Sequence, residues 1–127
     1  MTKPLLLIVD DEPEMAEFVA EAAVSVGFDT LLATSSEEFQ CFYMQNKLSG
    51  IVMDIVMPDM DGLELVTWLS ENQCHIPIIF MSGYDKQYLQ MADQIGIGQG
   101  CTVLGTLVKP FTREEIEPLF QRVLMNG

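Results

Sequence analysis

The stretch Ile51-Val-Met-Asp-Ile-Val-Met-Pro-Asp-Met-Asp-Gly62 joins a short apolar run to a single acid and then to a loop. The apolar run meets Asp54, and proline, aspartate and glycine punctuate the residues that follow. This pattern predicts a buried strand that delivers one carboxylate to its carboxyl end. Open α/β sheets place their chemistry at that end of the strands.

Two further apolar runs finish in charge. Leu5–Val9 is followed by Asp10-Asp-Glu12, and the run that begins at Leu107 leads into Lys109 and Pro110. Three strand-like runs therefore present charged side chains at their carboxyl ends, which packing alone does not require. An aspartate after one strand would be weak evidence, but the agreement of three strands indicates a functional site.

Length and hydropathy indicate one compact domain that comprises residues 1–127. The hydrophobic fraction is 49% and the mean hydropathy is +0.24, which suits a sheet covered by helices on both faces. No apolar run approaches the ~20 residues needed to span a bilayer. The amino terminus lacks the shape of a signal peptide, because Lys3 is followed by only a short apolar run before the acids. We expect a cytoplasmic protein.

The charge balance limits the partners of this domain. The chain has 19 acidic and 6 basic residues and a formal net charge of −13. Direct nucleic-acid binding and attachment to an anionic membrane are therefore not expected, since both need a basic face. Metal cations or a basic partner surface would be attracted.

Cysteine and histidine are too sparse for several other kinds of site. Cys41, Cys74 and Cys101 are widely spaced, and His75 is the single histidine. This pattern favours free thiols over a disulfide framework or a zinc site. His75 precedes a predicted strand and should lie at the amino end of the sheet, away from the chemistry.

Strand and helix patterns alternate along the chain. Strands are expected at 5–9, 30–33, 50–54, 77–81 and 102–108. Helices are expected from Pro13 to Gly27, at 63–72 and at about 85–95, with a glycine-rich connection at 96–100. Two more helices should open at the capping boxes Ser35-Ser-Glu-Glu38 and Thr112-Arg-Glu-Glu115. Pro118 lies inside the last of them and should distort its first turns.

Five alternating strands and helices predict a doubly wound (βα)5 fold with a parallel sheet and right-handed crossovers. The two commonest orders for such sheets are Rossmann-like and flavodoxin-like. Gly-x-Gly-x-x-Gly is absent after the first strand, where Asp10-Asp-Glu-Pro-Glu14 stands instead, so a dinucleotide is excluded there. We therefore expect the flavodoxin-like order 2-1-3-4-5.

In that order the first and third strands are neighbours about 4.8 Å apart, and Asp10, Asp11 and Asp54 should converge. Two carboxylates ~4 Å apart repel by roughly 4 kcal/mol at an effective dielectric of 20. A cation would relieve this repulsion, and oxygen ligands without histidine or cysteine suit a hard ion. Mg²⁺ is the expected ion because it accepts a partial protein shell.

Ser82 and Lys109 follow the fourth and fifth predicted strands. An ammonium group and a hydroxyl beside a metal-bound carboxylate suit a transferring phosphoryl group, and Asp54 would be the nucleophile. Each residue also has a structural alternative: Asp11 could cap a helix, Ser82 could be a turn hydroxyl and Lys109 a surface lysine. Their agreement on one phosphoryl site favours the functional interpretation.

The combination of motifs is specific and spans the whole chain. The motifs are Asp10-Asp11, Val52-Met-Asp54 with Met57-Pro-Asp-Met-Asp-Gly62, Ser82-Gly83 and Lys109-Pro-Phe111. With them the chain resembles the receiver domain of two-component response regulators. The resemblance implies that Asp54 accepts a phosphoryl group from the phosphohistidine of a sensor histidine kinase or phosphotransfer protein. It implies no enzyme activity beyond autophosphorylation and autodephosphorylation.

The resemblance also implies a role for each site residue. Asp11, the side chain of Asp54 and the backbone carbonyl of Val56 would hold Mg²⁺, and Asp10 would contact it through water. Ser82 and Lys109 would bind phosphoryl oxygens. Phosphorylation would change the surface formed by the fourth helix, fifth strand and fifth helix, which would bind an output domain or protein and permit a homodimer.

Three features depart from the usual family pattern. Thr106 stands where a switch aromatic is usual, Val56 is apolar where a polar side chain is frequent, and the connection 96–105 is long and rich in glycine, as in receivers attached to cyclic-di-GMP phosphodiesterase modules. The first alternative is therefore a degenerate receiver that binds constitutively. The second is a Mg²⁺-dependent aspartyl phosphatase of the haloacid dehalogenase type. That chemistry needs an acid two residues after the nucleophile, where Val56 stands.

Overall fold

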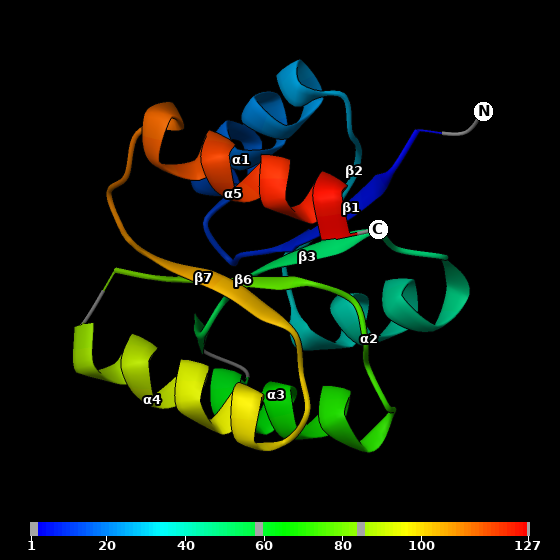
Figure 1. Cartoon of the computed structure of the whole chain (residues 1–127), viewed down its shortest axis with the longest axis vertical. Helices are drawn as coiled ribbons and strands as arrows, with labels where there is room; N and C mark the ends of the chain where they lie inside the picture. The colour runs from blue at the N-terminus through cyan, green and yellow to red at the C-terminus, as the bar shows by residue number, and fades with distance from the viewer. Residues whose placement is uncertain (1–2, 58–59, 84–85, 127) are drawn as a thin grey trace.

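The computed structural model describes residues 3–57, 60–83 and 86–126. The chain forms a three-layered α/β sandwich (Figure 1). Five parallel strands make the central sheet in the order β2-β1-β3-β6-β7. The main strands are β1 (Leu5–Val9), β2 (Asp29–Ala33), β3 (Gly50–Asp54), β6 (Ile78–Ser82) and β7 (Val103–Val108), and a small antiparallel pair comprises β4 (Val56–Met57) and β5 (Met60–Asp61). The five main strands thus confirm the flavodoxin-like order 2-1-3-4-5.

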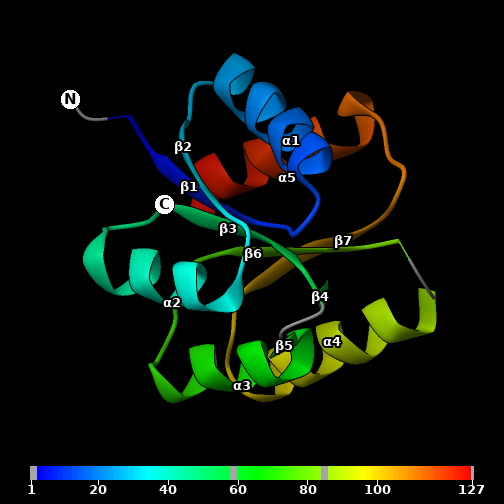
Figure 2. The same cartoon turned by 180° about the vertical axis from the view of Figure 1, so that it is seen from behind.

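Helices cover both faces of the sheet, as Figures 1 and 2 show from opposite sides. One face carries α1 and α5, and the other carries α2, α3 and α4. Their bounds are α1 (Pro13–Val26), α2 (Ser36–Gln45), α3 (Gly62–Glu71), α4 (Lys86–Gly98) and α5 (Arg113–Asn126). Within the described ranges, no helix is long and apolar enough to cross a bilayer.

The strands read as continuous apolar runs because alternate side chains enter two different cores. In β3, Ile51 and Met53 join the core beneath α2, α3 and α4, whereas Val52 joins the core beneath α1 and α5. The same alternation separates Phe80 from Ile79 in β6. All five residues are fully buried. This double burial explains why the sequence shows no polar alternation along these strands.

The predicted helix signals operate largely as expected. Pro13 begins α1, and Gly27 ends it in the left-handed region at φ 115°. The hydroxyl of Ser35 accepts a hydrogen bond from the Glu38 N–H at 3.2 Å. The Glu38 carboxylate turns to the backbone N–H of Thr34 at 2.9 Å and not to that of Ser35. These local bonds fix the start of α2 at the predicted place.

The predicted glycine-rich connection before β7 is wrong. Gly96 and Gly98 belong to α4, and only residues 99–102 separate that helix from β7. A Cβ atom on Gly96 would lie 2.9 Å from a methyl group of Val103, so glycine here permits a close approach of α4 to β7. The turn expected at Pro58 and Asp59 lies outside the described residues.

Gly62 closes the loop that follows Asp54. Its N–H donates to the carbonyl oxygen of Ile55 at 3.0 Å, and this contact folds the β4–β5 pair back on the end of β3. A Cβ atom on Gly62 would lie 2.4 Å from both the Cα and the carbonyl oxygen of Ile55. Because these are backbone atoms, no side-chain rotation relieves the clash.

We expect Gly62→Ala to destabilise the fold by about 3 kcal/mol, at the upper end of the range for overpacking. Gly98→Ala is the matched control, since its Cβ would meet nothing within 4 Å and a helical alanine is favoured over glycine by up to about 1 kcal/mol. Urea unfolding measures both. Equal stability of the Gly62 variant and the wild type would contradict the close approach to Ile55.

Candidate functional site

Four acids converge where β1 and β3 end. These strands pair directly, with Val9 opposite Met53, so the residues that follow them meet at one edge of the sheet. Ligand oxygens of Asp10, Asp11, Glu12 and Asp54 all lie within 4.8 Å of one another. The structure therefore brings together the three aspartates that the sequence predicted, and it adds Glu12.

Lys109 enters this cluster from the end of β7 and contacts three of its acids. Its Nζ donates to Asp10 Oδ2 at 2.7 Å, to Asp54 Oδ2 at 3.0 Å and to Glu12 Oε1 at 3.0 Å. The Lys109 side chain is only 8% exposed. Its backbone N–H donates to the carbonyl oxygen of Ser82 at 2.8 Å, which anchors the lysine to the end of β6. The alternative of a surface lysine is excluded.

Asp10 and Asp54 are held in the same way. Asp10 Oδ1 accepts the N–H of Glu12 at 2.9 Å, and Asp54 Oδ1 accepts the N–H of Val56 at 3.0 Å. In each carboxylate the second oxygen accepts from Lys109. Backbone on one side and ammonium on the other therefore fix the orientation of two carboxylates whose side chains are 0% and 4% exposed.

Burial and ion pairing shift the pKa values of Asp10 and Lys109 in opposite directions. Burial raises the pKa of Asp10, and the hydrogen bonds from Lys109 and from the Glu12 backbone offset this rise only in part. Burial by itself would lower the pKa of Lys109, but hydrogen bonds to Asp10 and Asp54 outweigh it, so the pKa of Lys109 is raised. Lys109 is therefore a firmly protonated cation inside the cluster.

The remaining predicted residues border the acids. Ser82 is fully buried at the last position of β6, opposite Val108 in the register of β7. Val56 is half-buried and pairs with Asp61 in the β4–β5 hairpin. Thr106 is exposed on β7, and because it is a threonine the position carries no aromatic side chain.

Glu12 is the contact that sequence reasoning missed. The sequence shows the acid run after the first strand, but its pattern indicates no role for Glu12, the third acid. Glu12 precedes α1 as its N-cap residue and meets a lysine 97 positions later in the chain. No local spacing rule connects two residues so far apart, and only the strand order brings them together.

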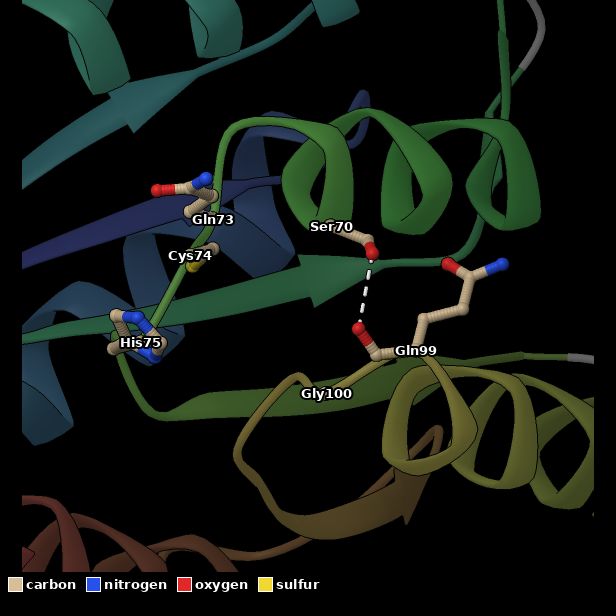
Figure 3. Close-up of a pocket in the computed structure, with 6 residues that line it drawn as sticks. All are labelled: Ser70, Gln73, Cys74, His75, Gln99 and Gly100. Carbon is tan, nitrogen blue, oxygen red and sulfur yellow. Dashed lines mark hydrogen bonds between the residues drawn. The ribbon is translucent and has the colours of Figure 1, made fainter.

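The opposite edge of the sheet carries different residues (Figure 3). A pocket of about 270 Å³ lies near the amino ends of β6 and β7 and is lined by Ser70, Gln73, Cys74, His75, Gln99 and Gly100. The Ser70 hydroxyl donates to the Gln99 carbonyl at 3.0 Å. His75 thus lies at the amino end of the sheet, as predicted.

All three cysteines are free, and the acid cluster is the only group of three or more potential metal ligands found among the described residues.

Comparison with known proteins identifies the family. The model of the response regulator receiver domain matches residues 6–121, and the chain belongs to this family of signalling domains. The transcriptional regulatory protein TrcR of Mycobacterium tuberculosis is 30% identical over 112 residues, which are 87% of this chain and 41% of TrcR. The regulatory protein AtoC of Escherichia coli is 27% identical over 119 residues, 94% of this chain and 25% of AtoC. The chain thus spans less than half of either relative.

Solved structures show the same fold. The chemotaxis protein CheY4 of Vibrio cholerae superimposes with a TM-score of 0.81 at 26% identity, covering 96% of this chain and 99% of that one. The receiver domain of the Francisella response regulator 1452 gives a TM-score of 0.79 at 26% identity, with 97% and 98% covered. The fold is therefore that of a receiver domain.

We expect Asp10→Asn to be more stable than the wild type at neutral pH without divalent cations. The variant removes a carboxylate whose charge is disfavoured by burial, and Lys109 keeps Asp54 and Glu12 as partners. Since the pKa of Asp10 is raised, its contribution to stability is complete below the ordinary value of 3.8 and is lost as the pH rises through the raised pKa. The advantage of the variant should therefore grow with pH.

Urea unfolding at several pH values, with Asp29→Asn as an exposed control, measures this difference. An advantage of Asp10→Asn that shrinks as the pH rises would contradict the electrostatic account.

Proposed function

We propose that this chain is a receiver domain that accepts a phosphoryl group on Asp54 from the phosphohistidine of a sensor histidine kinase or phosphotransfer protein. The contact of the Lys109 ammonium with both Asp54 and Asp10, at 3.0 and 2.7 Å, carries this proposal. It supplies a positive charge beside a buried carboxylate, as phosphoryl transfer requires.

In the proposed reaction an Asp54 oxygen forms a bond to phosphorus while the phosphorus–nitrogen bond of the donor imidazole breaks. The imidazole nitrogen leaves with the electron pair. Lys109 would bind one phosphoryl oxygen through its ammonium, and the hydroxyl of Ser82 would donate to another. The hydrogen bond from Val56 N–H to Asp54 Oδ1 orients the carboxylate toward the incoming group.

The donor set fits Mg²⁺. Asp11, Asp54 and the backbone carbonyl of Val56 would hold the ion, with Asp10 contacting it through water. The four clustered carboxylates are hard oxygen donors, and one Lys109 ammonium leaves their summed negative charge only partly compensated. Bound there, Mg²⁺ would offset negative charge on the transferring phosphoryl group.

The signal would be a change of shape read by a partner. We propose that phosphorylation alters the surface of α4, β7 and α5, which then binds an output domain or protein or a second copy of the chain. TrcR is named as a transcriptional regulator, and a similar output would lie in another part of the protein. Free thiols at all three cysteines support a reducing, cytoplasmic location.

Asp54→Asn should abolish the phosphoryl adduct, because an amide oxygen is too poor a nucleophile to form the acyl phosphate. Intact-mass spectrometry after incubation with acetyl phosphate and Mg²⁺ should show an alkali-labile gain of one phosphoryl group on the wild type. Asp29→Asn, an exposed acid at the other edge of the sheet, is the matched control and should label normally. An adduct retained by Asp54→Asn would identify another acceptor.

Asp11→Asn should weaken Mg²⁺ binding by at least about tenfold, since even outer-shell substitutions cost 10- to 100-fold in metal affinity. Titration calorimetry measures the affinity directly. The rise in melting temperature with added Mg²⁺ should be smaller in the variant. Glu14→Gln, which replaces an exposed acid in the first turn of α1, should match the wild type. Unchanged affinity in Asp11→Asn would remove this residue from the ligand set.

A further inference from the structure

All three hydrogen-bond donors of Lys109 are engaged. An ammonium group has three N–H donors, and the Nζ of Lys109 contacts Asp10, Glu12 and Asp54 at 2.7, 3.0 and 3.0 Å. A phosphoryl oxygen can therefore bind Lys109 in full only by displacing one of these carboxylates.

The exposed fractions of the three side chains identify the carboxylate that is displaced from Lys109. The side chains of Asp10 and Asp54 are 0% and 4% exposed, whereas that of Glu12 is 64% exposed. Until the bond to phosphorus forms, Asp54 is still a carboxylate, and release of either buried carboxylate from its cation leaves an uncompensated charge in a poorly solvated place. Glu12 can instead exchange its partner for water, since exposed ion pairs contribute little net stability.

The backbone holds Glu12 in position for this exchange. Its N–H donates to Asp10 Oδ1 at 2.9 Å, and Pro13 follows it at the start of α1. Glu12 is the N-cap residue, but its side chain forms no capping hydrogen bond. The side chain is therefore free to contact Lys109. Replacing it removes no hydrogen bond from the start of α1.

We propose that Glu12 is the exchangeable partner of Lys109, a positioning residue that holds the ammonium before transfer and is displaced by the phosphoryl oxygen. This inference rests on the proposed function of Asp54. With acetyl phosphate, an Asp54 oxygen bonds to phosphorus, the bond from phosphorus to the acetate oxygen breaks, and acetate leaves with the electron pair. Lys109 passes from Glu12 to a phosphoryl oxygen in the same step.

The exchange makes the Glu12 carboxylate a competitor of the phosphoryl group. Glu12→Gln keeps the shape of the side chain but replaces a charged acceptor by a neutral one. At saturating Mg²⁺ this variant should bind beryllofluoride about two- to fivefold more tightly than the wild type and react faster with acetyl phosphate by a similar factor. The range corresponds to the strength of an exposed ion pair.

Two further variants separate contact from overall charge. Glu12→Asp keeps the charge but is one methylene shorter, so it loses the 3.0 Å contact with Lys109 and should behave like Glu12→Gln. Glu14→Gln removes an exposed charge two residues away and should behave like the wild type. A separate Mg²⁺ titration of each variant ensures that every comparison is made at saturation.

The outcomes are distinct. Tighter beryllofluoride binding in both Glu12 variants, with Glu14→Gln unchanged, supports the exchange. Equal or weaker binding in Glu12→Gln, or the same gain in Glu14→Gln, overturns it while the phosphoacceptor function stands. Absence of both the beryllofluoride complex and the phosphoryl adduct in the wild type overturns the proposed function, and this inference with it.

Discussion

Lys109 joins the ends of three strands that are far apart in the sequence. It contacts Asp10 after β1 and Asp54 at the end of β3, and its own backbone is anchored to Ser82 at the end of β6. Without this cation two buried carboxylates would repel each other across adjacent strands. The acid edge of the sheet therefore depends on one lysine for its charge balance.

The architecture separates stability from chemistry. Two apolar cores on opposite faces of the sheet contain the fully buried apolar residues of β1, β3 and β6, and they fix the strand ends. Parallel strands place their carboxyl ends at a single edge. The negative charges there can exceed the positive charge without unfolding the domain, because the two cores lie away from that edge. The other edge, where His75 lies, carries no comparable group among the described residues.

Sequence reasoning predicted the five main strands to within about one residue and the strand order without error. It failed where glycine had two interpretations. Gly96 and Gly98 fit a glycine-rich connection, but both lie within α4, and at Gly96 the missing Cβ lets that helix approach Val103 in β7. Gly62 is a similar case, since the residue that requires its missing Cβ is Ile55. Such close approaches are tertiary properties that local patterns do not encode.

The sequence by itself determined the fold class and the convergence of Asp10, Asp11 and Asp54, because apolar periodicity and strand-end charges are local signals that a parallel sheet collects at one edge. Only the tertiary structure decided how those charges pair. The contact between Lys109 and Glu12 joins residues 97 positions apart, and the different burial of Glu12 and Asp10 follows from their surroundings. Pairing and solvation depend on distance in space, which the linear order of residues does not give.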